Sequence, residues 1–358
     1  RDAMESRGLG DVYKRPARTI RQHARKEASA PSRARRWCHA ADGAPDRRRV
    51  RYRRLNCTNS ATPQEPVNID WTDIRFDGKQ RFSVRRAKTS ISKLYEDKQD
   101  YEDQIERLRE AIDERQRVMY AHDRYSLLVV FQAMDAAGKD STIRAVFSGV
   151  NPHGVEITSF KHPSATELDH NFMWRTTVAM PRRGQIGVFN RSYYEDVLVC
   201  KVHPEIVTEY QKMPEEATRS LESLFEDRYE AIRAFERYSA DNGTVVLKFF
   251  LNISRDEQRE RFLSRIDEPD KNWKFSEADV RERGFWDEYQ QAYSDAINAT
   301  ATPYAPWFAV PADDKRTMRL IVASAVLDAL NGMDMAYPEV SKERARALQK
   351  CREELIDD

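Results

Sequence analysis

The chain has 358 residues, a formal net charge of +1 and 33% charged residues, which suits one large domain or two modest ones. No apolar stretch approaches 18 residues, so the sequence predicts no membrane-spanning helix. Its four cysteines are scattered without a C-x-x-C pair and its seven histidines are dispersed, which argues against a zinc site or a disulfide framework. This cysteine usage fits a reducing compartment, and we expect a cytoplasmic protein.

The first 66 residues differ in composition from the rest of the chain. They contain 17 Lys and Arg against seven Asp and Glu, whereas the remainder is net acidic. Because large apolar residues are few, we expect residues 1–66 to form an Arg-rich, disordered tail. A polyanion-binding arm and a targeting leader are the alternatives. Composition favours a solvated tail, and we expect no nucleic-acid partner.

Residues 67–122 predict an N-terminal extension followed by a long charged helix. Apolar residues recur there at spacings of three, four and seven: Leu94, Tyr101, Ile105, Leu108, Ile112 and Met119. These spacings place them on one stripe of a helix. The run is short for a coiled coil, so we expect the helix to pack against the main domain.

Strands and helices alternate between residues 123 and 335. The expected strands are 126–131, 155–160, 186–189, 244–251 and 307–310, and helical patterns lie near 140–149, 166–178, 192–239, 254–266, 276–299 and 315–331. This order predicts an α/β domain whose parallel sheet is covered on both faces and binds ligands at the carboxyl ends of its strands. Residues 336–358 are expected to form a C-terminal helix or tail.

The stretch 126–144, SLLVVFQAMDAAGKDSTIR, is typical of a loop that wraps phosphates. An apolar strand leads into a turn of small residues, and a helix with early hydroxyl groups follows. Backbone N–H groups of the turn and the helix dipole would face the anion, and Lys139 would reach its outer phosphates. The match to G-x-x-x-x-G-K-[ST] is imperfect, because Ala133 replaces the first glycine and Asp140 follows the lysine.

Asp135 lies inside this loop. A carboxylate beside bound phosphates is repelled unless a cation lies between them, so we interpret Asp135 as a Mg²⁺ ligand. The alternative is that Asp135 and Asp140 cap the following helix.

A second group of polar residues follows the strand at 186–189. Asn190 is suited to a metal-bound water or the substrate, and the planar fork of Arg191 is suited to the transferring phosphoryl group. Glu195 and Asp196 come one helical turn later, and we interpret them as supporting residues. The alternative is an exposed strand end with an incidental arginine.

Residues near 254–285 predict a lid. Basic residues gather there: Arg255, Arg259, Arg261, Arg265, Lys271 and Lys274. Such clusters close cations over phosphates and exclude water. We take Arg265 and Lys274 as candidate phosphate contacts. Arg259 and Arg261 are expected to pair with neighbouring glutamates on a solvated helix face.

Five ordered segments resemble the family-2 polyphosphate kinases over residues 69–330: MDAAGKDSTI, GVNPHGVEITSFKHPS, IGVFNRSYYEDVLV, DKNWKFSEADV and TPYAPWFAVPADDK. The resemblance implies a P-loop NTPase (thymidylate-kinase-like) fold, a three-layer α/β/α sandwich with a parallel sheet and a helical lid. It also implies Mg²⁺-dependent transfer of a terminal phosphoryl group between inorganic polyphosphate and a nucleoside mono- or diphosphate. By motif, Asp135 and Lys139 match the family's phosphate loop and Arg191 matches the arginine of its second motif. Arg265 aligns with a lid arginine and Asp279 with an acidic lid position.

The chain also departs from the family pattern. It has QAMDAAGKD where much of the family has EGxDAAGKG, and Asn190 where an aspartate is common. The combination of Met134, Asp140 and Asn190 resembles the subgroup that accepts both AMP and ADP, so that ATP forms from AMP in two steps. We expect a homo-oligomer, either a dimer or a tetramer.

These inferences define the candidate site. The candidate catalytic residues are Asp135, Lys139, Arg191 and Arg265, with Asp135 also the candidate metal ligand. The candidate phosphate- and nucleotide-binding residues are Ala136, Ala137, Gly138, Asp140, Ser141, Asn190, Lys274 and Asp279.

Further basic residues are expected to form a track for a polyanion: Lys161, Arg182, Arg183, Lys201, Lys315 and Arg316. Any single one of them is also compatible with ordinary solvated surface. Two other functions stay open, an ATP-dependent nucleoside monophosphate kinase and a non-catalytic polyanion-binding protein.

Overall fold

A six-stranded sheet forms the centre of the computed structural model, which describes residues 69–358. The expected tail, residues 1–66, lies outside the described residues. The strand order is β1-β6-β5-β2-β4-β3, and the strands are β1 (Arg75–Phe76), β2 (Ser126–Ala133), β3 (Val155–Ser159), β4 (Ile186–Asn190), β5 (Thr244–Asn252) and β6 (Trp307–Pro311). Neighbouring strands are parallel, except that β1 runs antiparallel to β6.

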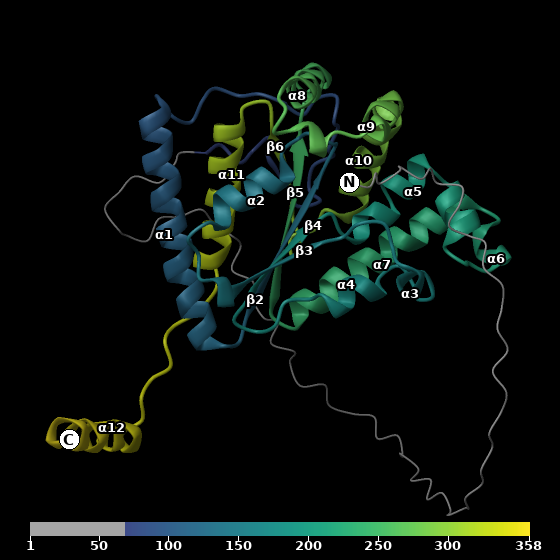
Figure 1. The fold of residues 1–358 in the computed structure, drawn as a ribbon. Coiled ribbons are helices and arrows are strands. Elements are labelled where there is room, and N and C mark those ends of the chain that lie inside the picture. Colours follow the sequence, from purple (N-terminus) through teal and green to yellow (C-terminus); the bar gives the residue numbers. More distant parts are fainter. Residues whose placement is uncertain (1–68) are drawn as a thin grey trace, which may run out of the picture. The chain divides into compact units, whose positions relative to one another are not determined.

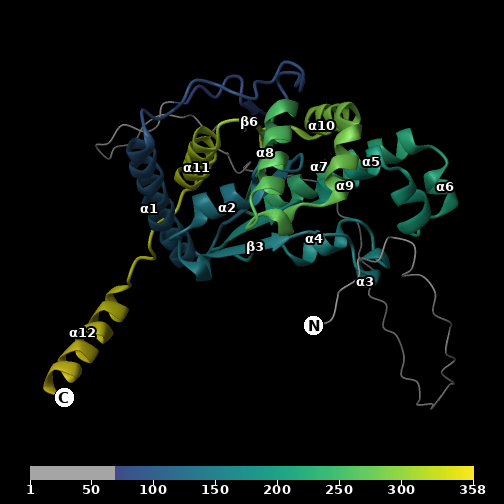
Figure 2. The same cartoon turned by 45° about the horizontal axis from the view of Figure 1, so that its top comes forward.

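Helices cover both faces of this sheet. The longer ones are α1 (Lys98–His122), α2 (Lys139–Phe147), α7 (Leu221–Asp241), α8 (Arg255–Asp267), α10 (Trp286–Thr300), α11 (Lys315–Asn331) and α12 (Lys342–Asp357). The short ones are α3 (Ala165–Leu168), α4 (Trp174–Val178), α5 (Val199–Val202), α6 (Glu215–Thr218) and α9 (Glu277–Glu282). In Figures 1 and 2, α1, α2 and α11 lie on one side of the sheet and α7 and α10 on the other. The expected α/β class with a mostly parallel sheet is confirmed.

Strand β2 shows why the sheet forms where it does. All eight of its residues are buried, because neighbours β4 and β5 flank it and helices cover both faces. A strand in this position must be apolar along its length rather than alternating, which is the pattern in the sequence. The carboxyl ends of β2 and β4 therefore lie side by side, with Phe131 opposite Asn190.

Helix α1 packs as its apolar stripe predicts. Its N-cap Asp97 accepts a hydrogen bond from the backbone N–H of Asp100, and the helix ends at Asp123 in the left-handed region. The stripe residues within the helix are buried, namely Tyr101, Ile105, Leu108, Ile112 and Met119. The first residue of the expected stripe, Leu94, precedes the helix and is half-buried. Figure 1 shows α1 alongside α11.

Two of the expected helices are interrupted. The pattern at 192–239 contains Pro204 and Pro214, and a continuous helix starts only at Leu221, after several short turns. The pattern at 276–299 breaks near Gly284 into α9, a 3₁₀ turn and α10. Strand β1 was not expected, because two residues are too few to show a pattern.

Helix α12 is the last element of the chain. It begins after N-cap Ser341, and every one of its residues is exposed. None of the helices between residues 69 and 358 combines the length and the apolar character that a bilayer crossing requires.

Candidate active site

The phosphate loop lies between the carboxyl end of β2 and the start of α2. Two of its residues have a positive φ, Ala136 at 61° and Gly138 at 106°. A Cβ on Gly138 would lie 3.3 Å from Ser141 Oγ, so glycine suits this position both conformationally and sterically. The Ser141 hydroxyl donates to the carbonyl of Gly138, which ties the loop to the first turn of α2.

Lys139 is the first residue of α2 and points back along the loop. Its Nζ donates to the carbonyl of Ala133 at 2.8 Å. Burial and the neighbouring guanidinium of Arg191 lower the pKa of Lys139, while the carboxylates of Asp135 and Glu195 oppose this shift. The ammonium is therefore desolvated and ready to neutralise an incoming anion.

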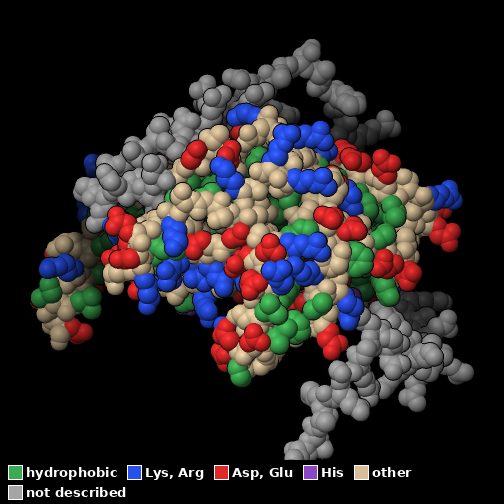
Figure 3. Space-filling model, turned by 90° about the horizontal axis from the view of Figure 1, so that it is seen from above, with side chains coloured by type: hydrophobic (Ala, Val, Ile, Leu, Met, Phe, Trp, Pro, Cys, Tyr) green, Lys and Arg blue, Asp and Glu red, His purple; other side chains and the backbone are tan. Residues whose placement is uncertain are grey.

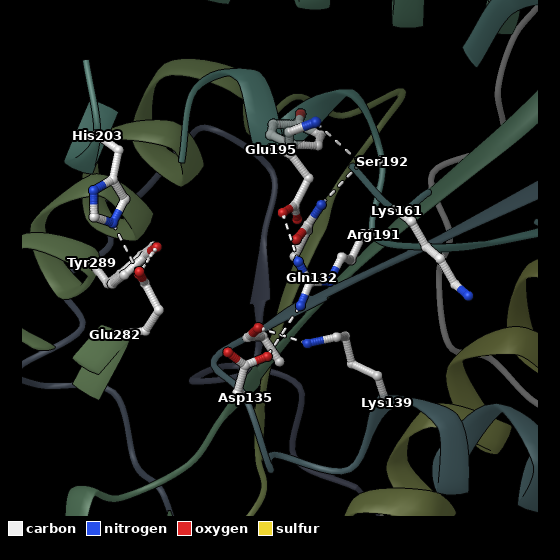
Figure 4. A network of polar contacts seen from close by, with 12 residues as sticks. Gln132, Asp135, Lys139, Lys161, Arg191, Ser192, Glu195, His203, Glu282 and Tyr289 are labelled. Carbon is white, nitrogen blue, oxygen red and sulfur yellow. Dashed lines mark hydrogen bonds and ion pairs between the residues drawn. The ribbon is translucent and has the colours of Figure 1, made fainter. Parts of the chain in front are cut away.

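Arg191 reaches the loop from the neighbouring strand. Its backbone has φ of 65°, and its N–H donates to the carbonyl of Phe131 at the end of β2. One guanidinium nitrogen lies 3.1 Å from Asp135 Oδ1 and another lies 3.4 Å from Glu195 Oε2. The carboxylate of Glu195 is the main reason that the pKa of Arg191 is raised. Figure 4 shows Asp135, Lys139, Arg191 and Glu195 converging at this point.

Asp140 and Asn190, where the chain departs from the resembled family, contact each other. The Asn190 side-chain amide donates to the Asp140 carboxylate across the gap between α2 and β4. The N-cap of α2 is Gly138 and no side chain caps the helix, so Asp140 does not cap it; its carboxylate fixes the orientation of Asn190 instead. The pair joins the two loops that form the site.

The expected lid is built from α8, α9 and the segment between them. Arg265 Nη1 lies 3.8 Å from Asp279 Oδ2, and both side chains are mostly buried. Burial and the nearby Asp135 carboxylate raise the pKa of Asp279, which indicates that this lid carboxylate faces the loop. Trp273 projects outward with 76% exposure, and its indole N–H donates to the carbonyl of Asp270 at 3.0 Å. The side chain of Lys274 lies outside what the structure describes.

The far end of the lid is held by a histidine. His203 Nε2 lies 2.9 Å from Glu282 Oε2, and the Tyr289 hydroxyl donates to the same oxygen at 2.7 Å. Figure 4 shows this contact across the cleft from the phosphate loop. The end of α9 is therefore tied to the body of the domain.

Arg261 has a role that the sequence did not reveal. It does pair with Glu257 at 2.8 Å, as expected, but its guanidinium is buried and not on a solvated face. It donates to the loop carbonyls of Ala136 and Ala137 and also to the carbonyls of Ala312 and Asp313 after β6. The helical spacing of Arg261 with Phe262 and Gln258, the buried residues of α8, is the signal that could have placed it.

Gln258 extends this support. Its side-chain amide donates to the backbone carbonyl of Asp135 at 2.9 Å and accepts from Arg283 at 2.8 Å. Arg283 lies between α9 and α10, so one buried side chain links the phosphate loop to the lid. The backbone of Asp135 is held by α8 while its carboxylate stays available to the cleft.

The expected track of basic residues is wrong in part, and the rest of it stays a prediction. Lys201 pairs with Asp295 at 2.6 Å. Arg182 and Arg183 line a hollow with Ser126 and Thr244, at the amino ends of the strands and therefore opposite the phosphate loop. The count of basic residues in the sequence could not show that Arg182 and Arg183 lie at the edge opposite the phosphate loop.

Lys161 and Lys315, in contrast, follow the carboxyl ends of β3 and β6. Figure 3 views the molecule from this side and shows Lys and Arg interspersed with Asp and Glu. Burial and the neighbouring Arg261 lower the pKa of Lys315, which places its ammonium beside the residue that supports the phosphate loop.

The residues present fit a magnesium ion that is completed by substrate. Within residues 69–358, no group of three or more His, Cys, Asp or Glu side chains is arranged to hold a metal on its own. Mg²⁺ is commonly bound by one or two carboxylates together with substrate phosphates and water. Asp135 offers one such carboxylate, 34% exposed, whose Oδ1 contacts Arg191. Asp135 is therefore the residue that would hold the ion.

Comparison with known proteins shows which family the chain resembles. The model of the polyphosphate kinase 2 (PPK2) family matches residues 95–338. The chain is 48% identical over 290 residues to an ADP-polyphosphate phosphotransferase of Rhodopseudomonas palustris, covering 81% of this chain and 100% of that protein. It is 42% identical over 267 residues to an AMP/ADP-polyphosphate phosphotransferase of Meiothermus ruber, covering 74% and 94%.

A solved structure agrees with these sequence matches. The crystal structure of polyphosphate kinase 2 from Arthrobacter aurescens TC1 superposes with a TM-score of 0.69 at 34% identity, covering 80% of this chain and 98% of that one. The family match spans the phosphate loop, the Arg191 segment and the lid. The chain therefore belongs to the polyphosphate kinase 2 family and is a phosphotransferase enzyme.

Proposed function

We propose that this enzyme transfers the terminal phosphoryl group between inorganic polyphosphate and a nucleoside mono- or diphosphate, converting AMP to ADP and ADP to ATP. The observation that carries the proposal is the convergence of Lys139, Asp135 and Arg191 at the carboxyl ends of β2 and β4. Phosphoryl transfer needs positioning and charge neutralisation more than covalent chemistry, and these groups supply both.

Each residue has a distinct part in the proposed reaction. The N–H groups of Ala136 and Gly138 bind phosphate oxygens, aided by the amino terminus of α2, while the N–H of Ala137 donates to the Met134 carbonyl at 3.3 Å. The ammonium of Lys139 and the guanidinium of Arg191 offset the charge on the transferring group. Arg265 closes over the phosphates from the lid with Asp279 beside it, and Lys274 stays a predicted phosphate contact.

We propose Mg²⁺ as the cofactor, held by Asp135 and substrate oxygens. Bound there, the ion would neutralise phosphate charge and keep donor and acceptor in line. Asn190 and Ser141 would orient the surrounding waters and phosphate oxygens, and Asp140 keeps the Asn190 amide in place.

Use of both AMP and ADP is supported by the paired departures at Asp140 and Asn190 and by the name of the Meiothermus ruber relative. A cytoplasmic location is supported by the scattered cysteines, of which Cys200 and Cys351 are free thiols in the described part of the chain. A homo-oligomeric state stays a prediction.

The test is an assay of the purified full chain with polyphosphate and Mg²⁺, given either AMP or ADP and no ATP. We expect ATP from ADP, and ADP followed by ATP from AMP, with products separated by charge. An ATP-dependent nucleoside monophosphate kinase would form nothing from AMP until ATP is added. From ADP it would form ATP only with an equal amount of AMP, whether or not polyphosphate is present. A non-catalytic binding protein would turn over neither mixture, and either result would contradict the proposal.

A further inference from the structure

The segment that carries Arg191 is held in an uncommon conformation. Arg191 has φ of 65°, a region that costs free energy for any residue other than glycine and persists only when the surroundings impose it. Glu195, which contacts the same guanidinium, lies four residues later in the 3₁₀ turn η2 (Tyr193–Asp196). The geometry of the site therefore depends on what holds η2.

The front of this segment is fixed from β2. Gln132 donates its side-chain amide to Ser192 Oγ at 3.1 Å, and both side chains are buried. Figure 4 shows this bond beside Arg191 and Glu195. Ser192 Oγ in turn accepts from the backbone N–H of Tyr194 at 3.2 Å, which fixes the start of η2 but not the tyrosine side chains.

The back of the segment rests on a buried charge pair. Tyr193 and Tyr194 each place their hydroxyl 2.8 Å from Oε1 of Glu236 on α7. The other oxygen of Glu236 lies 2.7 Å from Nζ of Lys248 on β5. Glu236 and Lys248 are both fully buried, with no exposed side-chain surface.

Every polar group of this pair has a partner. Lys248 Nζ also donates to the Tyr194 hydroxyl at 3.1 Å and to the carbonyl of Thr300 at 2.8 Å, which matches the three N–H donors of an ammonium. Burial and the charge of Glu236 raise the pKa of Tyr193 and Tyr194 well above the usual value, so both hydroxyls stay protonated donors.

Stability alone does not account for such a pair. Well-packed apolar residues of similar size are often as stabilising as a buried ion pair, because both charges must leave water. What distinguishes this pair is what it holds in place. Tyr193 and Tyr194, whose hydroxyls contact Glu236, lie between Arg191 and Glu195 in the sequence. An apolar substitute would fill the space without fixing the direction of η2.

We propose that Glu236 and Lys248 are positioning residues for Arg191, acting through the hydroxyls of Tyr193 and Tyr194. The inference rests on the proposed role of Arg191 in phosphoryl transfer. Neutralising Glu236 removes the charged acceptor that the two hydroxyls share and leaves Tyr194 with its contact to Thr300 Oγ1 at 2.9 Å. This change lets η2 relax and moves the guanidinium away from Asp135 and the phosphoryl group. Displacements of about 1 Å in a reacting geometry lower rates by about a hundredfold.

The test compares Glu236→Gln with Leu247→Ala in the full chain. Leu247 is also buried in β5, but alternation along the strand points it to the opposite face of the sheet from Lys248. We expect Glu236→Gln to lower kcat by about tenfold to a hundredfold, with the KM for ADP within about twofold. Leu247→Ala should lose stability by cavity formation yet keep its kcat within about twofold.

A second arm repeats Glu236→Gln in an Arg191→Ala background. If the pair acts by positioning Arg191, its removal changes kcat by less than about twofold once Arg191 is gone. An equal loss of kcat in both backgrounds, or wild-type kcat for Glu236→Gln, would overturn the inference while leaving the role of Arg191 intact. Wild-type kcat for Arg191→Ala alone would overturn both.

A milder variant keeps the test decisive if Glu236→Gln does not fold. Tyr194→Phe retains the ring and its packing, including its edge contact with Trp307, and removes only the hydroxyl. We expect the same fall in kcat and the same loss of effect without Arg191. A Tyr194→Phe enzyme that folds and turns over at the wild-type rate would contradict the proposal.

Discussion

Lys139 concentrates the chemistry of the site in one side chain. Its Nζ donates to the carbonyl of Ala133, and the carboxylates of Asp135 and Glu195 lie near enough to act on its pKa. Loss of one preorganised charge that stabilises a transition state commonly lowers turnover by a hundredfold or more.

We expect Lys139→Ala to lower kcat by at least about a thousandfold, because the variant loses the ammonium that offsets the charge of the transferring group. The matched control is Lys98→Ala, which removes an exposed lysine paired with Glu102 on α1. Steady-state kinetics on both variants checks the prediction. Comparable rates for Lys139→Ala and Lys98→Ala would contradict the assignment.

The same residue predicts a pH dependence. Burial and Arg191 lower the pKa of Lys139, so between this pKa and about 10.4 the unfolded chain holds a proton that the folded protein has released. In that window the contribution of Lys139 to the free energy of unfolding rises with pH, while turnover falls because the charged form is lost. The profile of kcat against pH should fall at alkaline pH for the wild type. The Lys139→Arg enzyme should lack this fall, because arginine stays charged.

Arg261 and Arg259 provide a contrast on one helix. Arg261 donates to four backbone carbonyls from a buried position, whereas Arg259 is 55% exposed and pairs with Asp256 and Glu260. We expect Arg261→Ala to reduce the free energy of unfolding by about 3–5 kcal/mol, since buried partners lose their donors. Arg259→Ala should cost about 1 kcal/mol or less. Urea unfolding of the two variants measures both losses of stability. Equal losses would argue against the role of Arg261 in holding the phosphate loop.

At the scale of elements, some features could be predicted from sequence and others could not. A continuous apolar run such as β2 predicts a buried parallel strand because nothing else accommodates it, and small residues before Lys139 require a turn. Periodicity also places α1 and α11 well. It fails at residues 192–239, where the helical pattern continues across prolines that a helix interior excludes.

The candidate site divides in the same way. Asp135 and Lys139 follow the end of β2, and Arg191 follows the end of β4. The sequence predicts that these ends lie at one edge of a parallel sheet, but not that β2 and β4 are neighbours, because β3 lies between them along the chain. Arg261 and the pair of Glu236 and Lys248 escaped prediction because their partners are distant in sequence and include backbone carbonyls. No local pattern distinguishes a charged residue that turns inward from one on a solvated face.

Short helix α5 offers a test of how firmly the element behind the site is held. Burial and the nearby Asp196 carboxylate raise the pKa of Cys200 to about 12, while Cys351 on α12 is exposed. At pH 8 about one Cys200 thiol in 10⁴ is ionised, so it should resist alkylation in the folded protein. Peptide-resolved mass spectrometry should find Cys351 labelled and Cys200 protected until denaturant is added. Equal labelling would show that α5 opens readily.

For the whole molecule, the comparisons locate the part that carries activity. The family match covers residues 95–338, and the Rhodopseudomonas palustris relative aligns over its full length with 290 residues of this chain. We expect removal of residues 1–66 to leave kcat and the KM for polyphosphate within about twofold, since the site residues lie in β2, β4 and the lid. A large loss of specific activity would show that the Arg-rich segment takes part in binding.

Because β2, β4, β5 and β6 are parallel, their carboxyl ends lie at one edge of the sheet, and the lid lies above the same edge. The opposite edge carries Arg182 and Arg183, a second place where a polyanion finds positive charge. We therefore expect catalysis only at the edge of the sheet that carries the phosphate loop.

A crystal structure of the full chain with ADP, Mg²⁺ and a short polyphosphate tests this expectation most directly. We predict that the polyphosphate end lies in the loop of residues 135–139, within hydrogen-bond distance of Lys139 Nζ and Arg191, with the ion on Asp135. Polyphosphate bound at Arg182 and Arg183 while that loop stays empty would contradict the account.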